Sequence, residues 1–223
     1  MTQTKPETIA VFGDIHGCID KLIEAVEPLK NTGYHLIFLG DLVDRAPTEG
    51  GDLKVLAYLK DLQENASDYG LFKVTILKGN HEMYLLNLKR QFKEHSFVNW
   101  LYNGGDINFF MDCDEYLPWI DSFKVKQVIG NYLFVHAGVR PGVDLKRQRL
   151  NDLLWIRDDF LDKENHGLPY VVVHGHTVQE ADEPVVTPYR VSMDLGACFG
   201  GPLLPYIITP EMQESVYGSL KIS

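Results

Sequence analysis

Residues 9–18, which read IAVFGDIHGC, join a short apolar run to two polar residues that could bind a metal ion. The first four residues are all apolar, which is typical of a buried β-strand. Asp14 and His16 follow directly, with a glycine on either side of the pair. From Ile19 onwards, apolar side chains recur at the spacing of one helix face. The segment therefore predicts a strand, a polar loop and a helix, with the loop as a candidate ligand site.

The same order of strand, polar loop and helix recurs twice in the first half of the chain. Residues 35–40 (HLIFLG) and 72–77 (FKVTIL) are expected to be strands. Leucines at helical spacing follow the first of them, and residues 82–94 are expected to form a helix after the second. Strands that alternate with helices in this way indicate an α/β fold with parallel strands.

From Phe123 onwards the pattern is mainly that of β-structure. Residues 123–138 (FKVKQVIGNYLFVHAG) predict two strands around a Gly130-Asn131 turn, and a helical stretch is expected around residues 151–161. Residues 96–119 are rich in aromatic residues, glycine and aspartate, and we expect an irregular excursion there that could cap a cleft. The remaining strands are expected in VVVHGH (171–176), RVSMDLG (190–196) and the closing segments PLLPYII (202–208) and SVYGSL (215–220).

The composition suits one compact domain, which we expect to cover residues 1–223, because 45% of the residues are hydrophobic. A formal net charge of −10 argues against a nucleic-acid partner, since binding a phosphate backbone needs a clustered basic surface. The N-terminus lacks the pattern of a signal peptide, and no apolar run approaches the ~18 residues of a membrane span. The three cysteines form no CxxC pair. We therefore expect a cytoplasmic protein without a membrane partner.

Five polar motifs each follow a predicted strand. In open α/β sheets the ligand crevice lies at the carboxyl ends of the strands, so these motifs can converge although more than a hundred residues separate them. Any one of them alone would be weak evidence for a site, whereas five in this arrangement favour a shared function. They are GDIHGC (13–18), GDLVDR (40–45), GNHE (79–82), HAG (136–138) and GHT (175–177).

The side chains in these motifs predict a centre for two metal ions. They offer oxygen and imidazole ligands without a thiolate, a set that suits Mn²⁺, Fe or Zn²⁺ better than Ca²⁺ or a structural zinc. Two ions that share a carboxylate can activate a water and bind the oxygens of a phosphate group. The candidate ligands are Asp14, His16, Asp41, Asn80, His136 and His176.

The order of the five motifs resembles that of the calcineurin-like metallophosphoesterases. Within this family the resemblance is to the phosphoprotein phosphatase branch, and in particular to its bacterial and bacteriophage lambda-type members, over residues 9–204. It implies a metallophosphoesterase fold, that is, a central β-sandwich of mixed sheets flanked by α-helices. It also implies two divalent metal ions, with Mn²⁺ as the expected metal and Fe or Zn²⁺ as alternatives.

The resemblance further implies a role for each matched residue. Asp14 and His16 would bind the first ion, Asp41 would bridge both ions, and the second ion would be held by Asn80, His136 and His176. His81 would be the general acid, with Asp44 orienting it, and a carboxylate partner favours the imidazolium form that a general acid needs. Arg45 and Arg157 would bind the substrate phosphate, because a guanidinium forms bidentate hydrogen bonds with it.

From this we expect a phosphomonoesterase, specifically a serine/threonine protein phosphatase, that uses metal-bound hydroxide for direct in-line attack on a phosphoprotein or a small phosphoester. The first alternative is a hydrolase of dinucleoside polyphosphates such as diadenosine tetraphosphate. That related family typically has GDLVARG and GNHD, so Asp44 and Glu82 favour a protein phosphatase. The second alternative is a metal-binding pseudoenzyme that acts as an interaction module. It would be marked by a lost ligand or acid, and none is missing.

Several residues leave alternatives open. Ala46 stands where the family commonly has glycine, and a positive φ there would strain it and disturb Arg45. Arg157 could instead form a surface salt bridge with Asp158 or Asp159. His174 could replace His176 as a ligand, although we expect it to support the site only. The other histidines, His35, His95 and His166, are expected at the surface or in turns, and Leu195 stands where threonine is usual.

Overall fold

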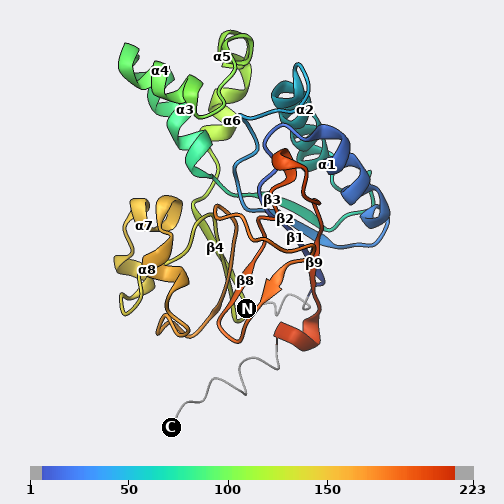
Figure 1. The fold of residues 1–223 in the computed structure, drawn as a ribbon. Helices are drawn as coiled ribbons and strands as arrows, with labels where there is room; N and C mark the ends of the chain where they lie inside the picture. The colour runs from blue at the N-terminus through green and yellow to red at the C-terminus, as the bar shows by residue number, and fades with distance from the viewer. Residues whose placement is uncertain (1–6, 214–223) are drawn as a thin grey trace.

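The computed structural model describes residues 7–213, which form two β-sheets with helices on their outer sides (Figure 1). The strands are β1 (Ile9–Phe12), β2 (His35–Phe38), β3 (Lys73–Ile76), β4 (Lys126–Ile129), β5 (Tyr132–Val135), β6 (Val171–His174), β7 (Val185–Val186), β8 (Arg190–Ser192) and β9 (Tyr206–Ile208). The α-helices are α1 (Ile19–Val26), α2 (Gly51–Glu64), α3 (Asn80–Arg90), α4 (Glu94–Tyr102), α5 (Ile107–Asp112), α6 (Leu117–Asp121), α7 (Leu150–Trp155) and α8 (Asp158–Leu161). Short 3₁₀ helices are η1 (Glu27–Leu29), η2 (Asp114–Tyr116), η3 (Leu145–Arg147) and η4 (Ala197–Phe199).

Both sheets are mixed. The first sheet has the order β3-β2-β1-β9, with β1, β2 and β3 parallel and β9 antiparallel to β1. The second sheet has the order β4-β5-β6-β8-β7, in which β5, β6 and β8 are parallel and the outer strands β4 and β7 run antiparallel to their neighbours. The expected α/β fold with mixed sheets is confirmed.

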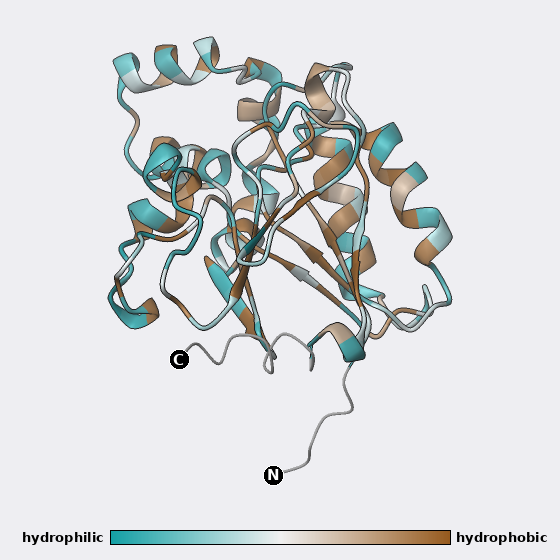
Figure 2. Ribbon diagram, turned by 60° about the horizontal axis from the view of Figure 1, so that its bottom comes forward, coloured by the Kyte–Doolittle hydropathy of each residue, from teal (hydrophilic) through white to brown (hydrophobic). Residues whose placement is uncertain are grey.

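The two sheets face each other across a shared hydrophobic core. Alternate residues of a strand point to opposite faces, so Ile9 and Val11 of β1 pack in a cluster with Phe134 of β5 and Val173 of β6. The intervening residues of β1 pack against the helices on the other face, such as α1 and α2. Figure 2 shows the strands as the most hydrophobic part of the interior, with hydrophilic surfaces on the helices. The central β-sandwich flanked by helices is therefore confirmed.

The segment 96–119, which we expected to be irregular, is mostly helical. Both of its glycines lie in the link between α4 and α5, where Asp106 accepts hydrogen bonds from the backbone N–H groups of Asn108 and Phe109 and so begins α5. The aromatic residues lie on the helices themselves, where Phe97, Trp100 and Phe110 pack their rings together.

Two further boundaries bear on the site. Helix α3 begins at Asn80, two residues earlier than expected, so it includes the GNHE motif in its first turn. The expected closing segment 215–220 lies outside the described residues. Over the described range, none of the helices has the length and apolar character that a membrane-crossing helix requires.

Candidate metal centre and phosphate site

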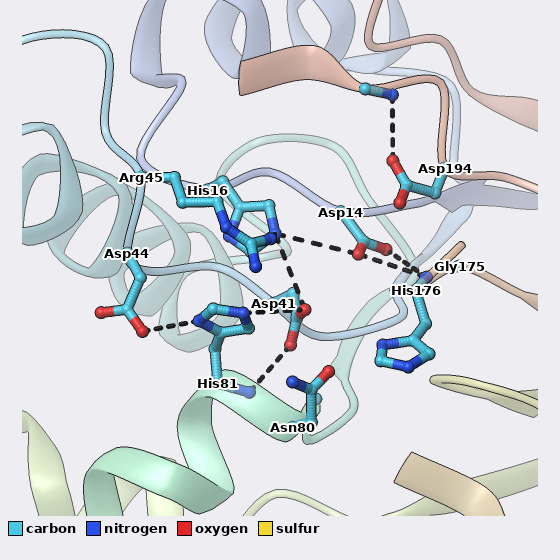
Figure 3. Close-up of polar contacts among 12 residues, drawn as sticks. Asp14, His16, Asp41, Asp44, Arg45, Asn80, His81, Gly175, His176 and Asp194 are labelled. Atoms are coloured by element: carbon cyan, nitrogen blue, oxygen red, sulfur yellow. Dashed lines mark hydrogen bonds and ion pairs between the residues drawn. The ribbon is translucent and has the colours of Figure 1, made fainter. Parts of the chain in front are cut away.

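The loops that follow five parallel strands of the two sheets meet at one edge of the β-sandwich (Figures 1 and 3). They bring all six predicted ligands together, and each of these side chains is at most 6% exposed. From here on, "metal centre" means these six residues. Asp14 and His16 follow β1, Asp41 follows β2, Asn80 follows β3, His136 follows β5 and His176 follows β6.

Asp41 lies in the middle of the metal centre. Its Oδ2 atom is 3.6 Å from His16 Nε2, whereas its Oδ1 atom is 3.3 Å from His136 Nε2. Two groups of side chains are close enough to hold an ion, one made of His16, Asp41 and His81 and the other of Asp41, His136 and His176. Since Asp41 belongs to both groups, its position matches that expected of a bridging carboxylate.

The loops reach these positions through strained backbone conformations. His16, Asp41 and His176 all have positive φ, at 48°, 51° and 67°, where side chains are disfavoured by roughly 1–3 kcal/mol each. The buried carboxylate of Glu82 stabilises the loop that carries Asp41, because it accepts hydrogen bonds from the backbone N–H groups of Gly79, Asp41 and Leu42 at 2.8–2.9 Å. This role for Glu82 was not predicted.

The histidines present the lone pairs that metal ions require. His16 Nδ1 lies 2.8 Å from the carbonyl oxygen of Val43, and His136 Nδ1 lies 3.1 Å from that of Leu39. A carbonyl oxygen only accepts, so in both rings Nδ1 carries a hydrogen, and Nε2 is the nitrogen that faces the metal centre and can bind an ion in the neutral ring. His176 Nε2 is buried without a hydrogen-bond partner among the described residues.

Carboxylates are crowded around Asp14. Burial raises the pKa of Asp14 well above its usual range, and the neighbouring carboxylates of Asp194 and Asp41 raise it further. A bound cation would relieve this repulsion, so the residues present fit a divalent metal. Asp194 was not among the predicted site residues. The signal that could have revealed it is its place directly after the strand in RVSMDLG, which matches the placement of the other motifs.

His81 and Asp44 form the predicted pair. His81 Nδ1 is 2.6 Å from Asp44 Oδ2, and Trp100 Nε1 donates to the same oxygen at 2.9 Å. Burial acts to lower the pKa of His81, but the carboxylates of Asp41 and Asp44 hold it above its usual value. The Nε2 atom of His81 faces Asp41 Oδ2 at 3.9 Å. This arrangement can hold a proton on an imidazole directly beside the metal centre.

The two predicted phosphate-binding arginines lie on different sides of the metal centre. Arg45 Nη1 donates to His16 Nε2 at 2.8 Å, and the Arg45 backbone N–H donates to the carbonyl oxygen of Gly104 at 2.7 Å. Arg45 itself has φ 62°, whereas Ala46 is not among the residues with positive φ, so the expected strain at Ala46 is wrong.

Arg157 Nη1 donates to the His176 carbonyl oxygen and to Thr177 Oγ1, both at 2.9 Å. Within residues 7–213, Arg157 forms no salt bridge with Asp158 or Asp159, which removes the surface alternative.

A cavity of about 140 Å³ opens beside the metal centre. Both arginines line it, and so do three aromatic residues, namely Tyr84 of α3, Trp100 of α4 and Trp155 at the end of α7. Its lining is formed by Asp41, Arg45, Asn80, His81, Tyr84, Trp100, Asn103, Trp155, Arg157 and His176.

The other histidines lie outside the metal centre. His174 Nε2 pairs with Ser192 Oγ at 2.9 Å and joins neither group of potential ligands, as expected. His95 is exposed. The expectation of a surface or turn position is wrong for His35 and His166, which are each 1% exposed. Each buried ring has a hydrogen-bond partner. His35 Nε2 pairs with Thr75 Oγ1, and His166 Nε2 pairs with the carbonyl oxygen of Tyr189.

The sequence matches the family model of the calcineurin-like phosphoesterases over residues 7–201. It is 31% identical over 144 residues to the symmetrical bis(5'-nucleosyl)-tetraphosphatase of Nitrosospira multiformis, an alignment that covers 64% of this chain and 47% of the relative. The protein of the same name from an Escherichia coli O17:K52:H18 strain is 32% identical over 140 residues, or 61% of this chain and 45% of the relative. The chain thus spans about half the length of the curated relatives that it matches.

Solved structures share the fold. A candidate diadenosine tetraphosphatase superposes with a TM-score of 0.58 at 20% identity, over 91% of this chain and 94% of that one. The cold-active protein-tyrosine phosphatase of a Shewanella species superposes with a TM-score of 0.63 at 17% identity, over 92% and 80% of the two chains.

The curated relatives overturn the prediction of a serine/threonine protein phosphatase and, with it, that of a phosphomonoesterase, because these relatives are symmetrical bis(5'-nucleosyl)-tetraphosphatases. The prediction rested on Asp44 and Glu82. In the structure both side chains are fully buried, and neither lines the cavity. Asp44 supports His81, and Glu82 holds the backbone of the loop after β2. Because neither residue can contact a substrate in the cavity, their identities do not indicate the substrate class.

Proposed function

Because this chain belongs to the calcineurin-like phosphoesterase family, we propose that it hydrolyses dinucleoside polyphosphates with two divalent metal ions. The single observation that carries the proposal is the position of Asp41, which is shared by two groups of potential ligands beside a cavity lined by two arginines. The choice of substrate is supported by the names of the curated relatives.

Six side chains would hold the ions in this proposal. Asp14, His16 and Asp41 would hold the first ion, and Asp41 would be shared with a second ion held by Asn80, His136 and His176. Two ions bound there would supply Lewis-acid chemistry, which lowers the pKa of water and neutralises phosphate charge. We propose Mn²⁺ because the donor set combines carboxylate and amide oxygens with imidazole nitrogens and has no thiolate.

The remaining residues act on the substrate. Arg45 and Arg157 would pair with phosphate oxygens, since both guanidinium groups line the cavity and each is held by hydrogen bonds to the chain. His81 would hold a proton at Nε2 for the departing oxygen, with Asp44 fixing its orientation through Nδ1. Water would add across one P–O–P bridge of the substrate and release two nucleotides.

The test uses metal-stripped protein with Mn²⁺ added back and diadenosine tetraphosphate as substrate. We expect hydrolysis that depends on the metal, with nucleotide products separated by ion-exchange chromatography. Fe²⁺ and Zn²⁺ serve as comparison metals, and a phosphoserine peptide serves as a comparison substrate. Faster hydrolysis of the phosphopeptide than of diadenosine tetraphosphate, or full activity in the stripped protein, would contradict the proposal.

A further inference from the structure

Two exposed aromatic side chains lie beside the metal centre. Trp155 is the last residue of α7, is 41% exposed and lines the cavity. Phe199 is the last residue of η4 and is 70% exposed. Neither belongs to a hydrophobic cluster of the described residues. Each ring therefore keeps exposed surface that a bound ligand could cover.

The two rings lie on opposite sides of Asp41. On one side, the guanidinium carbon of Arg45 is 6.0 Å from the centre of the Phe199 ring, and Arg45 contacts His16, which faces Asp41 Oδ2. On the other side, the Trp155 ring lies edge-on to that of His176, with 6.1 Å between their centres. Figure 3 shows Arg45 and His176 on either side of Asp41, and in Figure 1 α7 and the segment around residue 199 lie on opposite sides of the strand ends.

His136 completes the connection from Asp41 to the Trp155 side. Its Nε2 atom is 3.3 Å from Asp41 Oδ1 and 3.2 Å from His176 Nδ1. Each ring also has an arginine nearby, since Arg157 follows Trp155 by two residues and donates to the His176 carbonyl oxygen. The order along the site is therefore aromatic ring, arginine, metal centre, arginine, aromatic ring.

We infer that Phe199 and Trp155 each stack on one nucleobase of a dinucleoside polyphosphate, so that the polyphosphate lies across Asp41. This inference rests on the proposed function and names the residues that would select its substrate. Such a molecule has a flat aromatic base at each end and an anionic chain between them, which matches the order of groups along the site. Stacking accepts any base, because every base has a π-face.

This arrangement also predicts where the chain is cut. With both bases held, the centre of a tetraphosphate lies near Asp41, and water adds across the central P–O–P bridge to give two nucleoside diphosphates. When one ring is removed, the polyphosphate can shift along the site. Water then also adds across an outer bridge and gives a monophosphate and a triphosphate.

The experiment compares Trp155→Ala and Phe199→Ala with the conservative variants Trp155→Phe and Phe199→Tyr. The matched control is Phe72→Ala, because Phe72 is 59% exposed but directly precedes β3, at the end of the strand away from the metal centre. Diadenosine tetraphosphate and inorganic tetraphosphate, which has the P–O–P bridges but no base, are the two substrates. Binding of a methylene-bridged diadenosine tetraphosphate analogue is measured by calorimetry.

We expect each alanine variant to raise the ratio of the KM for diadenosine tetraphosphate to the KM for inorganic tetraphosphate by about tenfold. AMP and ATP should appear beside ADP, whereas the conservative variants and Phe72→Ala should give ADP alone. Unchanged ratios and products in both alanine variants would overturn the inference. If the natural protein does not cleave diadenosine tetraphosphate, the proposed function fails, and the analogue then decides this inference. Weaker binding in the alanine variants supports it, and equal or absent binding overturns it.

Discussion

The two sheets contribute different chemistry to the metal centre. The first sheet supplies the carboxylates, with Asp14 after β1 and Asp41 after β2, and its loops adopt positive φ around them. The second sheet supplies His136 and His176 and no carboxylate of the predicted ligand set. Burial, together with the neighbouring His136 and Arg157, lowers the pKa of His176 to about 3, which keeps it in the neutral form that binds metal.

Hydrogen bonds connect the two contributions. The backbone N–H of His176 donates to Asp14 Oδ1 at 3.0 Å, and His136 Nδ1 donates to the carbonyl oxygen of Leu39, which follows β2. Within the predicted ligand set, both carboxylates therefore come from the first sheet, and the second sheet adds two imidazoles to that of His16. The first sheet alone presents one group of potential ligands, His16, Asp41 and His81, whereas the second group forms only when the two sheets pack.

The largest effect is expected from Asp41→Asn, because this side chain belongs to both groups of potential ligands. The variant should lose about 10³-fold in turnover and should bind both ions more weakly. His176→Asn, on the second-sheet side, should weaken one ion only. Metal stoichiometry measured by mass spectrometry, together with turnover, distinguishes the two. Two tightly bound ions and full activity in Asp41→Asn would remove Asp41 from the bridging position.

His81→Asn should reduce turnover by about 10²-fold or more, because it removes the proton that Asp44 and Asp41 stabilise on the imidazole. The loss should be greater for a phenyl ester of ADP than for its p-nitrophenyl ester, since the less stable phenolate needs the proton more. Steady-state rates on the two esters measure this difference, with metal content as the control. An equal loss on both esters would assign His81 to positioning instead.

Glu82→Gln tests the support of the first-sheet loops. Glu82 accepts three backbone N–H bonds while fully buried, so the variant should lower the free energy of unfolding by about 2–3 kcal/mol. The matched control is Glu64→Gln, which removes an exposed carboxylate paired with Lys60 and should change stability by less than about 1 kcal/mol. Urea denaturation measures both. Equal stability of the two variants would show that the loop does not depend on Glu82.

Asp52→Asn tests charge on the first-sheet side through the slope of stability against pH. Burial raises the pKa of Asp52 to about 8, and the carboxylates of Asp44 and Asp106 add to the shift. The folded state thus holds a proton that the unfolded state releases, so stability falls as the pH rises from the usual carboxyl range to about 8. The slope is at most about 1.4 kcal/mol per pH unit, and Asp52→Asn should remove it.

The matched control lies on the second-sheet side. Asp152 is also buried, but its hydrogen bonds with Arg140 lower its pKa. The Asp152 carboxylate contributes to the free energy of unfolding only while it is ionised, and this contribution is lost as the pH falls. Asp152→Asn should therefore change only the acidic part of the curve of stability against pH. Unfolding free energies measured across pH would contradict the comparison if both variants flattened the same limb.

The sequence predicted the strands and the ligand-bearing loops well, for a physical reason. Strands buried on both faces consist of continuous apolar runs, as in β1 and β6, and a polar residue directly after such a run is conspicuous. Parallel strands then place those residues at one edge of the sheet. For this reason the convergence of Asp14, Asp41 and His176 could be expected without knowing a single distance.

The features that could not be predicted from the sequence depend on tertiary packing. The helices α4 and α5 are held together by the packing of Trp100 on Phe97 and Phe110, which local composition does not show. His35 is buried because Thr75 of the neighbouring strand satisfies its ring. The substrate class was predicted wrongly from Asp44 and Glu82. The sequence does not show that both side chains are buried and lie outside the cavity lining.

The hydrogen bond between Asp14 and His176 also has a consequence for the order of folding. Its two partners are 162 residues apart in the chain, and β1, which directly precedes the loop with Asp14, pairs on one edge with β9. Contacts this distant form late, because the entropy of closing long loops must be overcome first. A chain emerging from the ribosome therefore exposes one edge of β1 until residues 206–208 appear. Until His176 has appeared, the carboxylates of the first sheet are present without the full set of imidazoles, so capture of both metal ions is expected only after residue 176 has been made.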